Sequence, residues 1–188
     1  MSKNLEESGL KSIVSKYDLF FIDIWGVVHN GIKLYGHAVK VLEELYNNKK
    51  KFILLTNAPR PNLTVIKTLK KMGLSNFFDT VFTSGEAARR YLLENFNNKK
   101  FFHLGPPRDF DLFKTFEDNK VLNIDDSDYL LCSGLFEEHE DDLGYYKNLL
   151  SKHITKKMIC TNPDLIVDRG DKREYCAGSI AKSFEEID

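Results

Sequence analysis

The stretch Asp18-Leu19-Phe20-Phe21-Ile22-Asp23 decides the fold of this chain, because it is an apolar run that ends in a carboxylate. Aromatic and aliphatic residues in so short a segment favour a buried strand. A carboxylate is costly to bury without a partner, and ligands of open α/β sheets bind outside the carboxyl ends of the strands. Asp23 is therefore a candidate nucleophile or metal ligand. The alternative is an aspartate that caps the next turn.

A second strand is predicted at Lys51-Phe52-Ile53-Leu54-Leu55, which runs into Thr56-Asn57-Ala58-Pro59. Between the two strands, residues 36–46 carry apolar side chains at helical spacing. Strand, helix and strand form a βαβ unit, whose strands are parallel and whose crossover is right-handed. Parallel strands bring Asp23 and Thr56 to the same edge of the sheet, where a carboxylate, a hydroxyl and an amide can surround one small anion.

The rest of the chain continues to alternate between helical and strand patterns, which predicts an α/β fold throughout. Ser84 is expected to cap the helix that follows it. The expected helices span residues 4–16, 61–72, 86–96, 109–116, 141–151 and 178–184, and the expected strands span residues 80–83, 100–104, 129–132 and 158–161.

The composition is that of an ordinary folded protein. The chain has 188 residues, 42% of them hydrophobic, and a net charge of -1, which argues against disorder and against nucleic-acid binding. No apolar run approaches the length of a membrane span, and the polar first 17 residues do not resemble a signal peptide. Three widely spaced cysteines, Cys132, Cys160 and Cys176, indicate reduced, buried thiols. We expect a cytoplasmic protein.

Four motifs in order carry a resemblance to a known family. Together they resemble the haloacid dehalogenase-like (HAD) hydrolases of class IIA, the group of the NagD-type sugar and nucleotide phosphatases. The motifs are Asp23-Ile24-Trp25-Gly26-Val27-Val28-His29-Asn30-Gly31, Leu55-Thr56-Asn57-Ala58-Pro59, Thr161-Asn162-Pro163-Asp164 and Cys176-Ala177-Gly178-Ser179-Ile180.

The resemblance implies a two-part α/β protein. Residues 1–85 would form the N-terminal part of a Rossmann-like HAD core, and residues 86–177 an inserted α/β cap domain of the C2 type. Residues 178–188 would begin the return to a core whose remaining strands lie beyond this chain. The resemblance therefore also implies a chain that is truncated at its C-terminus.

The resemblance further implies a phosphohydrolase that acts on a small phosphorylated metabolite. Asp23 would be the nucleophile and form an aspartyl phosphate that water then hydrolyses. Mg²⁺ would be held by the Asp23 carboxylate and the Trp25 backbone carbonyl. Trp25, Gly26, Thr56 and Asn57 would hold the phosphoryl group.

Two residues of the third motif would contact the substrate. By resemblance, the loop with Asn162 and Asp164 faces the core, although Asp164 can also be read as a turn residue after proline. Arg60 could reach a phosphate, but a solvated arginine at a helix start is the favoured interpretation.

Trp25 departs from the family pattern, in which a second aspartate follows the nucleophile by two residues. An indole N–H cannot serve as a general acid or base, a role that typically contributes about 10²–10⁴ in rate. His29 is a candidate substitute, although a surface turn residue beside Asn30-Gly31 is the favoured interpretation. The alternative function is that of a non-catalytic HAD-like protein that binds a phosphorylated ligand or a partner.

The end of the chain is the second departure, because a Gly-Lys-Pro motif and an acidic Gly-Asp motif of the family are missing. Gly170-Asp171-Lys172 lies too early in the chain to replace them and is assigned to a loop at the end of the cap. The sequence is thus compatible with a fragment, a truncated reading frame or a degenerate, unstable relative. Exposed strand edges of an incomplete core would favour homo-oligomers.

Overall fold

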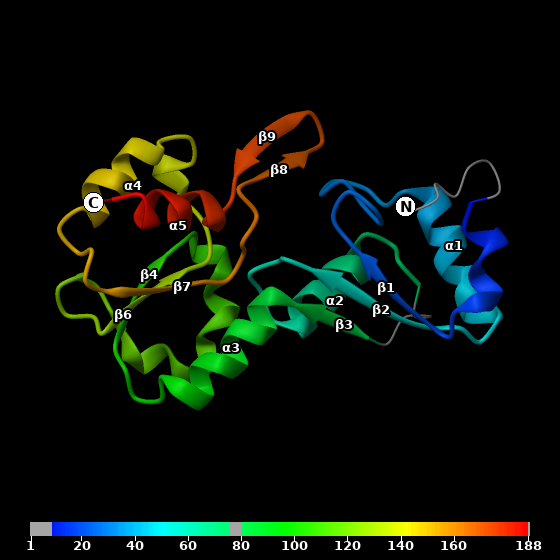
Figure 1. Cartoon of the computed structure of the whole chain (residues 1–188), viewed down its shortest axis with the longest axis horizontal. Coiled ribbons are helices and arrows are strands. Elements are labelled where there is room, and N and C mark those ends of the chain that lie inside the picture. Colours follow the sequence, from blue (N-terminus) through cyan, green and yellow to red (C-terminus); the bar gives the residue numbers. More distant parts are fainter. Residues whose placement is uncertain (1–8, 76–79, 188) are drawn as a thin grey trace.

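The computed structural model describes residues 9–75 and 80–187, and these form two lobes, each with its own parallel sheet (Figure 1). The sheet of the first lobe has the order β1-β2-β3, and that of the second lobe has the order β5-β4-β6-β7. An antiparallel hairpin, β8-β9, is separate from both. The strands are β1 (Leu19–Asp23), β2 (Lys51–Thr56), β3 (Val81–Thr83), β4 (Phe101–Leu104), β5 (Lys120–Val121), β6 (Tyr129–Cys132), β7 (Lys157–Cys160), β8 (Ile166–Arg169) and β9 (Lys172–Tyr175).

The first lobe contains the predicted βαβ unit. Strand β1 pairs with β2 in parallel so that Asp23 lies opposite Leu55, and Thr56 lies opposite Thr83 of β3. Two helices, α1 (Gly36–Asn47) and α2 (Asn62–Lys71), pack against this sheet. Its core consists of buried aliphatic side chains, namely Ile24, Val28, Leu42, Leu54, Val65, Leu69, Leu74 and Val81. The sequence prediction that Asp23 and Thr56 share one edge of a parallel sheet is therefore confirmed.

The N-terminal helix expected at residues 4–16 is not found in its described part. Residues 1–8 lie outside the described residues, and the remainder forms two short 3₁₀ helices, η1 (Gly9–Ser12) and η2 (Val14–Lys16). None of their residues is buried, so they lack the fully packed face that usually stabilises a longer α-helix.

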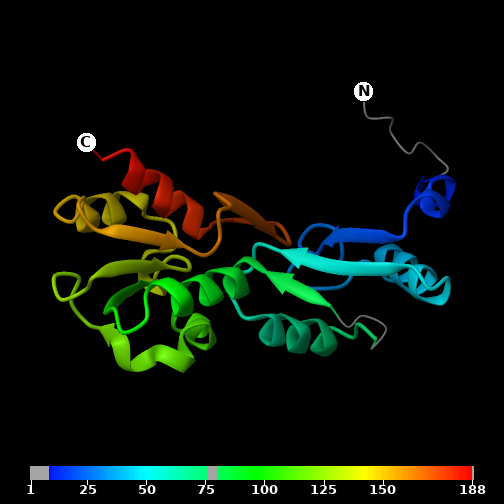
Figure 2. The same cartoon turned by 60° about the horizontal axis from the view of Figure 1, so that its bottom comes forward.

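Helices cover both faces of the second sheet (Figure 2). Helices α4 (Leu143–Leu150) and α5 (Ala177–Glu185) pack on one face around Leu130, Cys132 and Ile180. Helix α3 (Ser84–Asn95) and two 3₁₀ helices cover the other face around an aromatic cluster, which includes Phe101, Phe113 and Tyr129. The 3₁₀ helices of this lobe are η3 (Pro107–Leu112), η4 (Lys114–Asn119) and η5 (Glu137–His139). The domain boundaries after residues 85 and 177 stay a prediction.

Two local expectations for this lobe are wrong. Residues 109–116 form 3₁₀ turns instead of an α-helix, and the backbone at Phe116 is non-helical. The N-cap of α3 is Thr83 and not Ser84, because the Thr83 hydroxyl accepts a 2.9 Å hydrogen bond from the Glu86 amide. No helix within the described residues is long and apolar enough to cross a membrane.

Candidate active site

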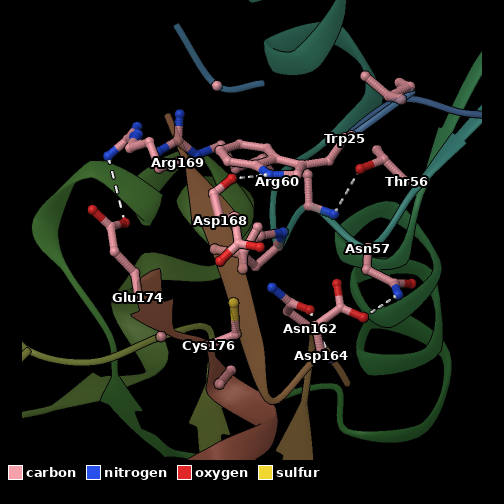
Figure 3. A pocket seen from close by; sticks show the side chains of 18 of the residues that line it. Trp25, Thr56, Asn57, Arg60, Asn162, Asp164, Asp168, Arg169, Glu174 and Cys176 are labelled. Atoms are coloured by element: carbon pink, nitrogen blue, oxygen red, sulfur yellow. Dashed lines mark hydrogen bonds and ion pairs between the residues drawn. The ribbon is translucent and has the colours of Figure 1, made fainter. Parts of the chain in front are cut away.

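A cavity of about 870 Å³ lies between the two lobes, a volume typical of small-molecule sites. The first lobe contributes the carboxyl ends of β1 and β2, and the second lobe contributes the segments after β4, β6 and β7 together with the hairpin. Figure 3 shows the side chains from the ends of β1 and β2, from the segment after β7 and from the hairpin. All of the residues expected at the site line this one cavity, namely Asp23, Trp25, Gly26, Thr56, Asn57, Asn162 and Asp164.

The loop after β1 holds Asp23 at the cavity wall. The Ile24 amide donates to the Leu55 carbonyl at 3.0 Å, and the Val28 amide donates to the Ile24 carbonyl at 2.8 Å. Ile24 and Val28 are buried, so the loop is anchored by its apolar residues while Asp23 stays exposed. Gly26 permits the turn because its φ is +78°.

Partial removal of the Asp23 carboxyl from water at the cavity wall raises its pKa above the usual value, and the nearby Asp164 carboxylate raises it further. A hydrogen bond with the Ile24 backbone opposes both effects. Because Asp164 disfavours the charged form of Asp23, a cation bound here would stabilise the Asp23 carboxylate.

Backbone hydrogen bonds distinguish the two amides that follow Asp23. The Gly26 N–H already donates to the His29 carbonyl at 2.8 Å. Within the described residues, the Trp25 N–H donates no hydrogen bond. Of these two amides, only that of Trp25 is free to bind an anion in this conformation.

Asn57 and Asp164 join the two lobes at the cavity. The Asn57 side-chain amide donates to the Asp164 carboxylate at 2.8 Å. The Asp164 amide in turn donates to the Asn162 side-chain oxygen at 3.0 Å, so Asn162 fixes the turn that presents Asp164. Thr56 lies beside them, with its hydroxyl accepting from the Ala58 amide at 3.2 Å.

Trp25 contacts the hairpin of the second lobe. Its indole N–H donates to the Asp168 carbonyl at 2.9 Å (Figure 3). Sequence reasoning missed this hairpin, although the signal was present. Gly170-Asp171 between two four-residue strands is a turn pair typical of two-residue hairpin loops.

His29 also differs from its expectation as a surface residue. It is part of the turn at Asn30-Gly31, but it is only 7% exposed. Its Nδ1 accepts a 2.9 Å hydrogen bond from the Gly31 amide, and burial lowers its pKa. His29 is therefore neutral near pH 7 and a weak candidate for the missing general acid.

A buried polar network at the second-lobe side of the cavity was not predicted. Arg60 was expected to be solvated, but its Nε pairs with the Asp109 carboxylate at 3.0 Å. Asp109 also accepts a 2.9 Å hydrogen bond from Ser133, and the Ser133 hydroxyl lies 2.8 Å from His103 Nε2. Burial raises the pKa of Asp109, an effect that Arg60 opposes. Nothing in the local sequence marks Asp109 as a buried residue.

Side chains alone do not form a metal cage at this site. Among residues 9–75 and 80–187, no group of three or more His, Cys, Asp or Glu side chains is arranged to hold a metal ion. Mg²⁺ does not require such a cage, because it keeps several waters and binds through one or two carboxylates plus phosphate oxygens. The Asp23 carboxylate and a backbone carbonyl fit that ion.

Comparison with known proteins agrees with this geometry. A family model described as haloacid dehalogenase-like hydrolase matches residues 20–117. A haloacid dehalogenase-like family hydrolase from Brucella suis 1330 is 29% identical with a TM-score of 0.87, covering 95% of this chain and 68% of that one. The 4-nitrophenylphosphatase from Thermotoga maritima is 28% identical with a TM-score of 0.66, covering 93% of this chain and 66% of that one.

A p-nitrophenyl phosphatase from Archaeoglobus fulgidus is more distant. It is 20% identical with a TM-score of 0.66, covering 89% of this chain and 63% of that one, and it supports the fold alone. The chain thus spans about two thirds of the length of these solved proteins. No curated protein matches it significantly.

Proposed function

Because this chain belongs to the haloacid dehalogenase-like hydrolase family, we propose that it hydrolyses the phosphate monoester of a small metabolite in the cavity between its lobes. The observation that supports the proposal best is the position of Asp23 and Thr56, which lie at the carboxyl ends of adjacent parallel strands and line the same cavity. We also propose that residues 1–85 belong to the catalytic core and residues 86–177 to the cap.

Asp23 acts as the nucleophile in this proposal. One of its oxygens attacks phosphorus, the bond from phosphorus to the ester oxygen breaks, and the departing alkoxide takes a proton from water. Water then attacks the phosphorus of the aspartyl phosphate and the bond from phosphorus to the Asp23 oxygen breaks, which restores the carboxylate. The proton that this water loses neutralises the hydroxide left by the first step, and inorganic phosphate leaves. The Trp25 amide, the Thr56 hydroxyl and Asn57 hold the phosphoryl oxygens. Gly26 does not bind the phosphoryl group in this proposal, because its amide is already hydrogen-bonded to the His29 carbonyl. Its role is to give the loop its positive φ.

Mg²⁺ is the cofactor that this donor set fits. The Asp23 carboxylate and the Trp25 carbonyl would hold it, and when bound it would neutralise negative charge on the phosphoryl group. On the cap side, Asp164 and Asn162 shape the wall that the leaving group faces.

The test uses the full chain, 4-nitrophenyl phosphate and Mg²⁺. We expect turnover that falls at least about a thousandfold in Asp23→Asn, with an unchanged melting temperature. Asp18→Asn is the matched control, because Asp18 is a fully exposed carboxylate just before the same strand and should leave turnover unchanged. Equal activity of Asp23→Asn and the wild type would refute the nucleophile assignment.

A second candidate function is phosphate-ligand binding without turnover. It is favoured by Trp25, whose side chain is hydrogen-bonded to Asp168 and carries no proton-transfer group. Two results together would favour this function over hydrolysis. Orthovanadate would raise the melting temperature in the presence of Mg²⁺, and no phosphate ester would be hydrolysed.

A further inference from the structure

The loop after β1 and the tip of the β8-β9 hairpin contact each other through two hydrogen bonds. The Trp25 indole N–H donates to the Asp168 carbonyl at 2.9 Å. The Gly170 amide donates to the Asn30 carbonyl at 3.2 Å. Both bonds connect the first lobe to a hairpin that belongs to neither large sheet, and Figure 3 shows the Trp25 side chain directed at Asp168.

Two glycines allow this close approach. A Cβ on Gly31 would lie 2.6 Å from the Trp25 ring, and a Cβ on Gly170 would lie 2.6 Å from the Ile32 side chain. The Trp25 ring also meets the His29 ring edge-to-face, with their centroids 5.2 Å apart. The indole is therefore closely packed, and its contacts with Gly31 and His29 fix its direction toward the hairpin.

Apart from the chain on either side of it, the hairpin is held by weak interactions, among them a 3.6 Å ion pair from Lys172 to Glu140 of the second lobe, whose two side chains are about half exposed. It has only two strands, and an isolated two-stranded hairpin is marginally stable in water. Its internal ion pairs, Asp168–Arg173 and Arg169–Glu174, join exposed or half-exposed side chains and contribute little. The two hydrogen bonds to the loop that carries Asp23 are therefore the main contacts that hold the hairpin across the cavity.

We propose that Trp25 is a positioning residue that holds the β8-β9 hairpin against the Asp23 loop and so closes the cavity over the nucleophile. Position 25 is where the family pattern has an aspartate that transfers protons. In this chain the residue there, Trp25, makes an inter-lobe hydrogen bond instead. If the proposed function holds, the closed hairpin has a consequence for substrate choice: the leaving group must be small enough to fit inside the cavity. The contact between Trp25 and the hairpin can be tested without measuring turnover.

Hydrogen exchange of the full chain gives the first test. Trp25→Phe keeps an aromatic ring but removes the indole N–H and part of the fused ring, so amides of residues 166–175 should exchange about fivefold faster than in the wild type. Tyr91→Phe is the control, because Tyr91 is a half-exposed ring on α3 outside the cavity. Unchanged exchange in the hairpin of Trp25→Phe would overturn the proposal.

Fluorescence gives a second test, because Trp25 is the sole tryptophan of the chain. Gly31→Asn displaces the ring without removing it, since asparagine tolerates a positive φ but its Cβ meets the indole. Gly73→Asn is the matched control, with a φ of +95° and open space around its Cβ.

We expect red-shifted emission, stronger acrylamide quenching and faster hairpin exchange in Gly31→Asn alone. Emission and exchange that match the Gly73→Asn control would overturn the proposal. If the wild-type chain has no phosphatase activity but Gly31→Asn still shows these changes, the role of Trp25 in holding the hairpin is supported and only the proposed function is refuted.

Discussion

The side-chain amide of Asn57 donates a 2.8 Å hydrogen bond to the carboxylate of Asp164, and this bond crosses from the first lobe to the second. Asn57 follows β2, whose end lies opposite Asp23. Asp164 follows β7 of the other lobe, and its charge raises the pKa of Asp23. The two lobes therefore set the electrostatics of the candidate nucleophile jointly.

Removing the charge of Asp164 should lower the pKa of Asp23. Asp164→Asn keeps an oxygen that can accept from Asn57 but no longer repels the Asp23 carboxylate. If Asp23 must be ionised for turnover, the acidic limb of the pH profile of kcat/KM should move to lower pH. Asp168→Asn, a change at an exposed carboxylate of the hairpin, should leave that limb in place. A limb that moves equally in both variants would contradict this account.

Arg60 should stabilise the protein by compensating the buried Asp109. Arg60→Ala leaves that carboxylate 2% exposed and without its charge partner, which should cost up to about 3 kcal/mol in the free energy of unfolding, because Arg60 is itself partly exposed. Arg108→Ala, which removes an exposed neighbouring cation, should cost much less. Urea unfolding at pH 7 measures both.

The same variant should change the pH dependence of stability. Burial already raises the pKa of Asp109, and loss of Arg60 should raise it further. A folded-state pKa above the unfolded value of 3.8 means that stability is greatest below that value and declines as pH rises. The free energy of unfolding of Arg60→Ala should therefore fall more steeply than that of the wild type as the pH is raised above 4. Parallel profiles would show that Arg60 does not control the Asp109 charge.

His103 should make the protein sensitive to acid. Burial, with a smaller effect of Lys120, lowers the pKa of His103 from 6.5 to about 3. The unfolded chain therefore takes up a proton below pH 6.5 that the folded protein does not, and stability should fall as the pH decreases from 6.5 toward 3. His103→Gln should remove up to about 1.4 kcal/mol per pH unit of that slope. His37→Gln, at an exposed histidine of α1, should keep the slope of the wild type.

The sequence predicts the βαβ unit of the first lobe well, because the signals there are local. An apolar strand, a helix at regular spacing and a second apolar strand suffice to place Asp23 and Thr56 together. The β8-β9 hairpin also had a local signal, the turn pair Gly170-Asp171, which was assigned only to a loop. The α3 cap was missed by one residue, because Thr83 and Ser84 both carry hydroxyls and only the backbone geometry distinguishes them.

Asp109 and the Trp25 contact could not be predicted in this way. The buried Asp109 is paired with Arg60, which is distant in sequence and lies in the other lobe. The partner of the Trp25 indole is a backbone carbonyl 143 residues away, and a backbone carbonyl carries no residue-specific signal. Sequence patterns therefore place the reactive groups on their strands, but they do not show how the second lobe encloses them.

The missing general acid should make turnover depend strongly on the leaving group. The only side-chain N–H of Trp25 donates its hydrogen bond to the Asp168 backbone carbonyl, and the lowered pKa of His29 leaves that residue neutral. An alkoxide leaving group needs a proton, whereas 4-nitrophenolate leaves without one. We expect kcat/KM for 4-nitrophenyl phosphate to exceed that for a simple alkyl phosphate of similar size by at least about a hundredfold, the lower end of what a general acid contributes. Steady-state rates over a series of aryl and alkyl phosphates measure this slope. A shallow dependence would show that another residue of the cavity supplies the proton, and Asp164, beside Asn57, would be the first to replace.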